Sequence, residues 1–104
     1  MVRIYLSKGE FESSDMIPLY HSCCVGTIRV RDGDMRLFDL LSDRRFELVV
    51  HDCCFRNSVM VGYYLLSNVM GVGWGGGSIM VNYWDCRKLD DIEVRDVLLG
   101  LILE

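Results

Sequence analysis

The spacing of apolar residues constrains the fold of this 104-residue chain more than any other feature of its sequence. Val2, Ile4 and Leu6 alternate with polar or larger residues, and residues 26–31 alternate in the same way, which is the two-residue period of a half-buried strand. Other short runs are rich in Val and Tyr, which strands favour. The pattern therefore predicts strands over residues 2–6, 17–24, 26–31, 46–54, 59–66 and 79–84, and a seventh strand or a short helical turn over residues 35–41.

The C-terminal residues follow a helical period instead. Asp90, Glu93, Asp96, Gly100 and Glu104 recur at steps of three or four, so they share one face of a helix. Asp90 and Glu93 also have the spacing of a capping box, in which each side chain satisfies a free backbone amide of the first turn. We expect a helix over residues 90–103, with an apolar face that docks on the sheet and consists of Ile92, Val94, Val97, Leu98, Leu101 and Ile102.

Together these patterns predict an α+β fold that is mainly β. No linker or low-complexity segment divides the chain, so we expect residues 1–104 to form a single domain. A twisted antiparallel sheet or a small barrel of six to seven strands, with the C-terminal helix packed on it, would bury the apolar faces of both element types. The dipeptide Asp32-Gly33 predicts a tight hairpin turn, because glycine adopts a positive φ without steric cost.

Residues 71–78 are mostly glycine and are predicted to form a flexible hairpin loop. They contain a G-x-G-x-x-G pattern, but a dinucleotide site needs that pattern to open a helix, and the next residues read as a strand. Trp74 has little reason to be buried in such a loop, and interface energy concentrates in Trp, Tyr and Arg side chains. We therefore predict an interaction surface made of Trp74 with the aromatic pair Tyr83 and Trp84.

The formal net charge of −4 argues against nucleic acid as the main partner, because nucleic-acid binding usually shows as a basic surplus. Arginines and aspartates are interleaved over residues 29–45, which is typical of a solvated surface of mixed charge. Arg29 and Arg31, next to the Asp32-Gly33 turn, are further candidate contacts. They would matter most if the partner were a nucleic acid.

Two segments, residues 21–24 and 51–54, share the pattern H-x-C-C. Because strand residues two apart face the same way, His21 with Cys23, and His51 with Cys53, could supply the four ligands of a tetrahedral zinc site. The alternative is that these cysteines are small hydrophobic residues in buried strands. Zinc is the one cofactor that the sequence suggests.

The residues needed for catalysis are poorly arranged. His51 and Cys54 would point to opposite faces of a strand, and Cys53 would lie parallel to His51 rather than hydrogen-bonded to it, so the histidine could activate neither thiol. Neither a G-x-S-x-G elbow nor an H-E-x-x-H helix occurs in the sequence. We expect a protein that is not an enzyme.

No apolar run approaches the ~20 residues that a membrane span requires. The N-terminal residues lack the apolar region and the cleavage site of a signal peptide. We therefore expect a protein that is not secreted, has no membrane partner and works in the cytoplasm or nucleus of a cell.

The composition points to an unusual gene. The chain has no alanine, no glutamine, one proline and one threonine, although alanine is among the commonest residues of globular domains. Codons of these residues need cytosine, whereas the abundant Val, Gly, Asp, Leu and Cys can be written largely with G and T. We infer a cytosine-poor gene, as is frequent in small viral or other mobile genomes.

Three segments, residues 25–30, 46–50 and 61–68, resemble in their order the small β-barrel leader proteins of coronaviruses. The resemblance covers less than half of the chain and includes no catalytic or binding motif. It implies a small barrel that suppresses host translation.

These inferences lead to one functional expectation and two alternatives. We expect a small, virus-like accessory or regulatory protein that acts by binding a host or viral macromolecule. Its partner would be a protein, a second copy of the chain included. The alternatives are a zinc-stabilised regulatory module built on the two H-x-C-C segments, and a translation-suppressing leader protein.

Overall fold

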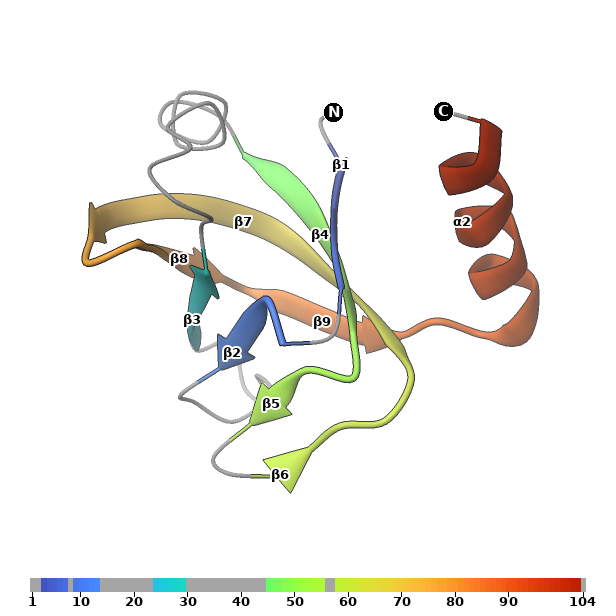
Figure 1. Ribbon diagram of the computed structural model, residues 1–104, viewed down its shortest axis with the longest axis horizontal. Coiled ribbons are helices and arrows are strands. Elements are labelled where there is room, and N and C mark those ends of the chain that lie inside the picture. Colours follow the sequence, from blue (N-terminus) through green and yellow to red (C-terminus); the bar gives the residue numbers. More distant parts are fainter. Residues whose placement is uncertain (1–2, 8, 14–23, 30–44, 56–57, 104) are drawn as a thin grey trace.

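The structure is a computed structural model that describes residues 3–7, 9–13, 24–29, 45–55 and 58–103, with the backbone alone at positions 74 and 101–103. The described residues form nine strands of one curled sheet and one C-terminal helix (Figure 1). The strands are β1 (Arg3–Leu6), β2 (Phe11–Ser13), β3 (Cys24–Arg29), β4 (Phe46–His51), β5 (Cys54–Phe55), β6 (Ser58–Val59), β7 (Tyr63–Gly75), β8 (Ser78–Tyr83) and β9 (Asp85–Lys88). The helix is α2 (Asp91–Leu103).

The sheet curls into a half-barrel. Its strand order is β1-β4-β7-β8-β3-β2-β5-β6, with β9 paired to β7. β1 and β4 stand at one end of this order, and β2 and β5 stand near the other end. Because β2 directly follows β1 in the chain, and β5 directly follows β4, the two ends of the sheet come back toward each other. The mainly β fold with a C-terminal helix is therefore confirmed, whereas the expected count of six to seven strands is too low.

The pairing also differs from a purely antiparallel sheet. β1 pairs with β4, and β2 with β5, in parallel, while the other pairs are antiparallel. Period-two patterns show which residues share a face, but they do not show which strands are neighbours. β2 itself was not predicted, because Phe11–Ser13 lies in a polar, turn-like stretch.

The main core fills the concave side of the half-barrel. On β4 the side chains of Phe46, Leu48 and Val50, at alternate positions, are buried there. β3 contributes Cys24 and Ile28, and β8 contributes Ile79 and Val81. Burial of these apolar surfaces is the dominant favourable term in folding.

The predicted glycine loop over residues 71–78 is wrong. Strand β7 continues to Gly75 and pairs with β8, so the connection contains only Gly76 and Gly77. Both glycines have positive φ, +62° and +77°, as a two-residue hairpin turn of the mirror-image type requires. Trp74 therefore lies in a strand, at the register position opposite Ile79, and its side chain is outside the described part.

The strand predicted over residues 46–54 is interrupted by a corner at Asp52. Asp52 has a φ of +47°, a left-handed conformation that reverses the alternation of side chains. Its backbone NH donates to the carbonyl of Gly62 at 2.9 Å, and its Oδ1 accepts from the Gly62 NH at 2.6 Å. Gly62, at φ +110°, adopts a conformation that other residues rarely reach.

The helix begins as the capping box predicts. The Glu93 NH donates to Asp90 Oδ1 at 2.8 Å, and the Asp90 NH donates to Glu93 Oε1 at 3.4 Å. The expected docking face is only partly correct. Val97 is buried and Val94 half-buried against the outer face of the sheet, but Ile92 is 72% exposed and Leu98 41% exposed.

Of the strand expected over residues 17–24, only Cys24 is described, and it begins β3. Residues 17–23, the predicted Asp32-Gly33 turn and the element expected over residues 35–41 lie outside the described residues. Within the residues that the structure describes, no helix has the length and apolar character needed to cross a membrane.

Candidate functional site

Tyr83, one of the predicted interaction residues, belongs to the core. Its side chain is 2% exposed, and its hydroxyl lies 2.6 Å from Ser13 Oγ, also buried. Phe11 packs edge-on against its ring. A partner could not reach Tyr83 without opening the half-barrel.

Trp84, the other member of the aromatic pair, is partly exposed at the kink between β8 and β9. The Arg45 guanidinium lies over its ring, 5.6 Å from the centroid, in cation–π geometry. The Asn68 amide joins the same region, accepting from Arg45 at 3.3 Å and donating to Asp85 at 2.7 Å. Trp84 remains available to a partner, but Arg45 already covers part of its ring.

Arg29 is exposed on β3 and forms an ion pair with Glu12 of the neighbouring β2. Arg31 lies outside the described residues, so the predicted arginine surface is described only at Arg29.

The two described members of the predicted zinc site lie on different faces of the sheet. Cys53 is buried in the main core, whereas His51 lines the outer face, because the left-handed Asp52 between them reverses the alternation. His21 and Cys23 lie outside the described residues. Within the described ranges, no group of three or more His, Cys, Asp or Glu side chains is placed to hold a metal ion, and the zinc site stays a prediction.

The core thiols are poor nucleophiles. Burial raises the pKa of Cys86 to about 12, and the nearby Cys53 and Cys24 thiols add to the rise. Burial also raises the pKa of Cys53. Both thiols are therefore protonated near neutral pH, and a thiol rather than a thiolate is unreactive.

A hollow of about 430 Å³ lies between α2 and the outer face of the sheet. Four apolar side chains line it: Val49 of β4, Leu65 of β7, Val97 of α2 and Leu89, which precedes the helix. Beside Gly100 the hollow is open, since a Cβ at that position would have no atom within 4 Å. An apolar hollow of this size can hold side chains of a partner or a small ligand.

Charged residues form the rim of this hollow. Arg87 of β9 donates to both carboxylate oxygens of Glu93 at 2.8 and 2.7 Å, and this pair ties the strand to the first turn of the helix. The Arg87 hydrogen bonds are the main reason that the pKa of Glu93 falls to about 2. On the opposite side Arg3 pairs with Glu47 at 3.0 Å, and Asp96 of α2 completes the rim.

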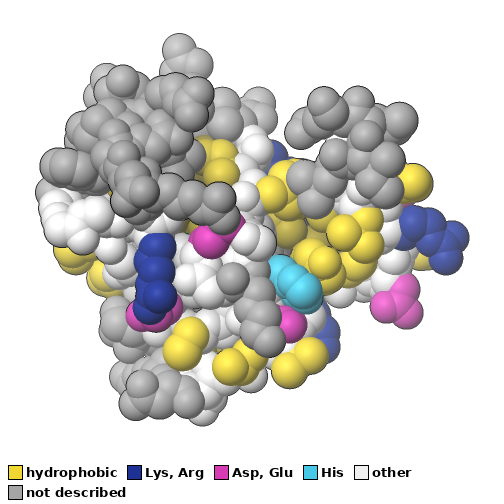
Figure 2. All heavy atoms as spheres, viewed as in Figure 1, with side chains coloured by type: hydrophobic (Ala, Val, Ile, Leu, Met, Phe, Trp, Pro, Cys, Tyr) yellow, Lys and Arg dark blue, Asp and Glu magenta, His cyan; other side chains and the backbone are white. Residues whose placement is uncertain are grey.

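A second hollow of about 240 Å³ adjoins the first, since Tyr5 and Val49 line both. There His51 and Tyr63 stack with ring centroids 4.3 Å apart, and His51 Nε2 lies 3.4 Å from Asp52 Oδ2. Glu10 lines its other side, where its carboxylate accepts from the Ser7 hydroxyl. In Figure 2 hydrophobic side chains fill the surface between the sheet and the helix, with a histidine at their border. We call the two hollows together the α2 groove.

The α2 groove was not predicted from the sequence. A signal was present at Val49 and Val50, two consecutive apolar residues in one strand, because such a strand is covered on both faces. Val50 faces the main core and Val49 the groove. Tyr5 lies similarly on the outer face of β1, between residues that the alternation assigns to the core.

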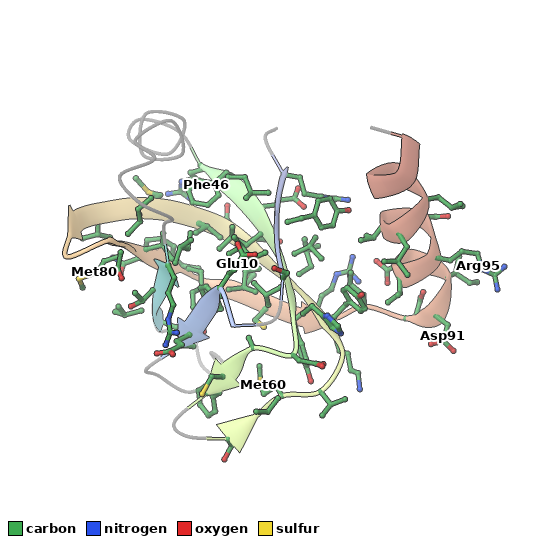
Figure 3. All side chains as sticks on the ribbon, in the orientation of Figure 1. Glu10, Phe46, Met60, Met80, Asp91 and Arg95 are labelled. Atoms are coloured by element: carbon green, nitrogen blue, oxygen red, sulfur yellow. The ribbon has the colours of Figure 1, made fainter. Side chains whose placement is uncertain are left out.

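A further apolar surface lies on the outer side of the β7–β8 hairpin, where Met70, Val72 and Met80 are exposed. Met80 points away from the sheet, on the far side of the molecule from α2 (Figure 3). The α2 groove combines a hollow with apolar and charged side chains, so it is the better candidate site.

No family model matches this chain, and searches of curated proteins and of solved structures find no match either.

Proposed function

We propose that this chain is a small, non-enzymatic accessory or regulatory protein that binds another protein through the α2 groove. The observation that carries the proposal is the groove itself: an open hollow with an apolar floor, four charged side chains on its rim and aromatic rings at one end. Interfaces of this kind place apolar anchors in a central pocket and polar groups around it.

The chemistry of the described side chains supports binding over catalysis. The buried thiols are protonated, and His51 stacks on Tyr63 beside an aspartate, apart from Cys53. The cytosine-poor composition supports a virus-like origin, and with it a host or viral protein as the partner.

The test is affinity capture with the full chain from cells of the natural host. Gly100→Leu places a side chain into the open part of the groove, whereas Arg95→Leu changes an exposed residue that points away from the sheet (Figure 3). We expect a protein captured by the wild type to be retained by Arg95→Leu and lost with Gly100→Leu. Equal capture by both variants would show that the binding surface lies elsewhere.

A further inference from the structure

The arginines of the α2 groove are already neutralised. Arg87 forms its two hydrogen bonds with Glu93, at 2.8 and 2.7 Å, and Arg3 pairs with Glu47 at 3.0 Å. A new anion in the groove would have to displace these carboxylates. The groove is therefore not an anion site, although two arginines line it.

Among the residues that the structure describes, two carboxylates of the groove have no cationic side chain paired with them. Asp96, at the helix side, forms no ion pair with any residue that the structure describes. Glu10, at the other end, accepts from the neutral Ser7 hydroxyl, which leaves its charge in place. The floor between them consists of apolar and aromatic side chains, among them Val49, Val97 and Tyr5.

From this arrangement we propose that the α2 groove binds a basic, apolar polypeptide segment. Its apolar side chains lie against the half-buried Tyr5 ring, above the nearly buried Val49, Leu65 and Val97. Its Lys or Arg side chains lie next to Asp96 and Glu10. Lys and Arg suit such a surface, because their methylene stems cover apolar area while the charged group stays in water. The Tyr5 and Tyr63 rings near Glu10 add aromatic faces that attract cations.

The two parts of the groove have different roles in this binding. Burial of apolar surface supplies most of the affinity, at roughly 25 cal/mol per Å². Exposed charge pairs contribute less, roughly 0.2–1 kcal/mol each, and act mainly on specificity and association rate. A groove with uncompensated carboxylates therefore selects basic over acidic segments of equal apolar content.

The inference rests on the proposed function and names the chemistry of the partner. Its probes are two synthetic amphipathic peptides of about 14 residues, roughly 21 Å as helices, one built from Leu and Lys and the other from Leu and Glu. Titration calorimetry with the full chain compares the wild type with Asp96→Asn, Gly100→Leu and Asp91→Asn. Asp91 is the matched control, an exposed aspartate of the same helix that points away from the sheet (Figure 3).

We expect the Leu/Lys peptide to bind at least about fivefold more tightly than the Leu/Glu peptide. Asp96→Asn should weaken the Leu/Lys complex by about 2–5-fold, and Gly100→Leu by at least about tenfold, while Asp91→Asn changes it by less than about 1.5-fold. Melting curves establish that each variant is folded. Equal binding of both peptides, or equal effects of Asp91→Asn and Asp96→Asn, would overturn the proposal, because either result means that the groove charges do not select the ligand.

Failure of this inference can be distinguished from failure of the proposed function. If Gly100→Leu abolishes capture of a natural partner while the Leu/Lys peptide does not bind, the groove is a protein-binding site of another chemistry. If neither capture nor peptide binding responds to Gly100→Leu, both proposals are wrong.

Discussion

At the scale of single residues, Gly26 shows how closely the core is packed. A Cβ at this position would overlap the ring of Phe11, which is 2% exposed and has no room to move away. Gly26→Ala should therefore lower the free energy of unfolding by on the order of 1–3 kcal/mol, as overpacked cores do. Gly73→Ala is the matched control, since a Cβ there has no atom within 4 Å and should be tolerated. Urea denaturation measures the free energy of unfolding of both variants. Equal stability of the two variants would contradict the close packing of Gly26 against Phe11.

Asp52 holds the corner between β4 and β5 through its side chain as well as its backbone. Asp52→Ala removes the acceptor of the Gly62 NH and places alanine at a φ of +47°. We expect a loss of roughly 1–3 kcal/mol in the free energy of unfolding. Asp52→Asn keeps an acceptor and a residue that tolerates this conformation, so it should cost less than about 1 kcal/mol. If the alanine variant matched the wild type in chemical denaturation, the side chain would have no part in holding the corner.

Glu93 makes the attachment of the helix sensitive to acid. Its pKa in the folded protein is about 2, below the ordinary value of 4.5, because Arg87 hydrogen-bonds the ionised carboxylate. Protonation therefore opposes folding, and the stabilisation is complete above about pH 5 and lost as the pH falls toward 2. We expect the melting temperature of the wild type to fall over this range more steeply than that of Glu93→Gln. Asp91→Asn, in the same helical turn, should follow the wild type, and parallel curves for all three proteins would contradict the role of Glu93.

At the scale of elements, α2 is attached to the sheet by a narrow strip of side chains. Val97 is 6% exposed and packs with Val49, Leu65 and Leu89, so Val97→Ala should cost about 1–2.5 kcal/mol of unfolding free energy. Leu98→Ala should cost less than about 1 kcal/mol of unfolding free energy, because Leu98 is 41% exposed. The helical period alone had assigned Leu98 to the docking face. Thermal or urea denaturation measures the loss of stability in each variant. A larger effect at Leu98 than at Val97 would mean that the helix docks through a different face.

At the scale of the whole molecule, the described residues form two cores. The larger core fills the concave side of the half-barrel, and the smaller core lies between the convex side and α2. Removal of residues 91–104 uncovers Val49, Leu65 and Leu89 but leaves the larger core in place. The shortened chain should keep its β-type circular dichroism, melt at a lower temperature and bind the dye ANS more strongly than the full chain. Complete loss of β structure would show that the larger core is not sufficient for folding.

Local sequence patterns predicted much of the fold, because they depend on neighbours along the chain. The alternation in β3, the buried strand β4, the strand β8 and the capping box of α2 agree with the structure, although β8 is followed by β9 and is not the final strand. Two residues of the predicted interaction surface lie in other surroundings than expected. Tyr83 continues the alternation of β8 and is buried with it, and the loop expected around Trp74 is a strand with a two-glycine turn. Both errors came from treating aromatic residues near glycines as exposed without knowledge of the strand register.

The sequence by itself determined the mainly β fold and the start of the C-terminal helix, because strand alternation and helix capping act over a few residues. Only the tertiary structure decided that β1 pairs in parallel with β4, that Asp52 turns His51 and Cys53 to opposite faces, and that α2 leaves a groove along Val49. These features depend on contacts between segments far apart in the chain. Such contacts are fixed by packing and by backbone hydrogen bonds across the sheet, for which a single sequence carries no local signal.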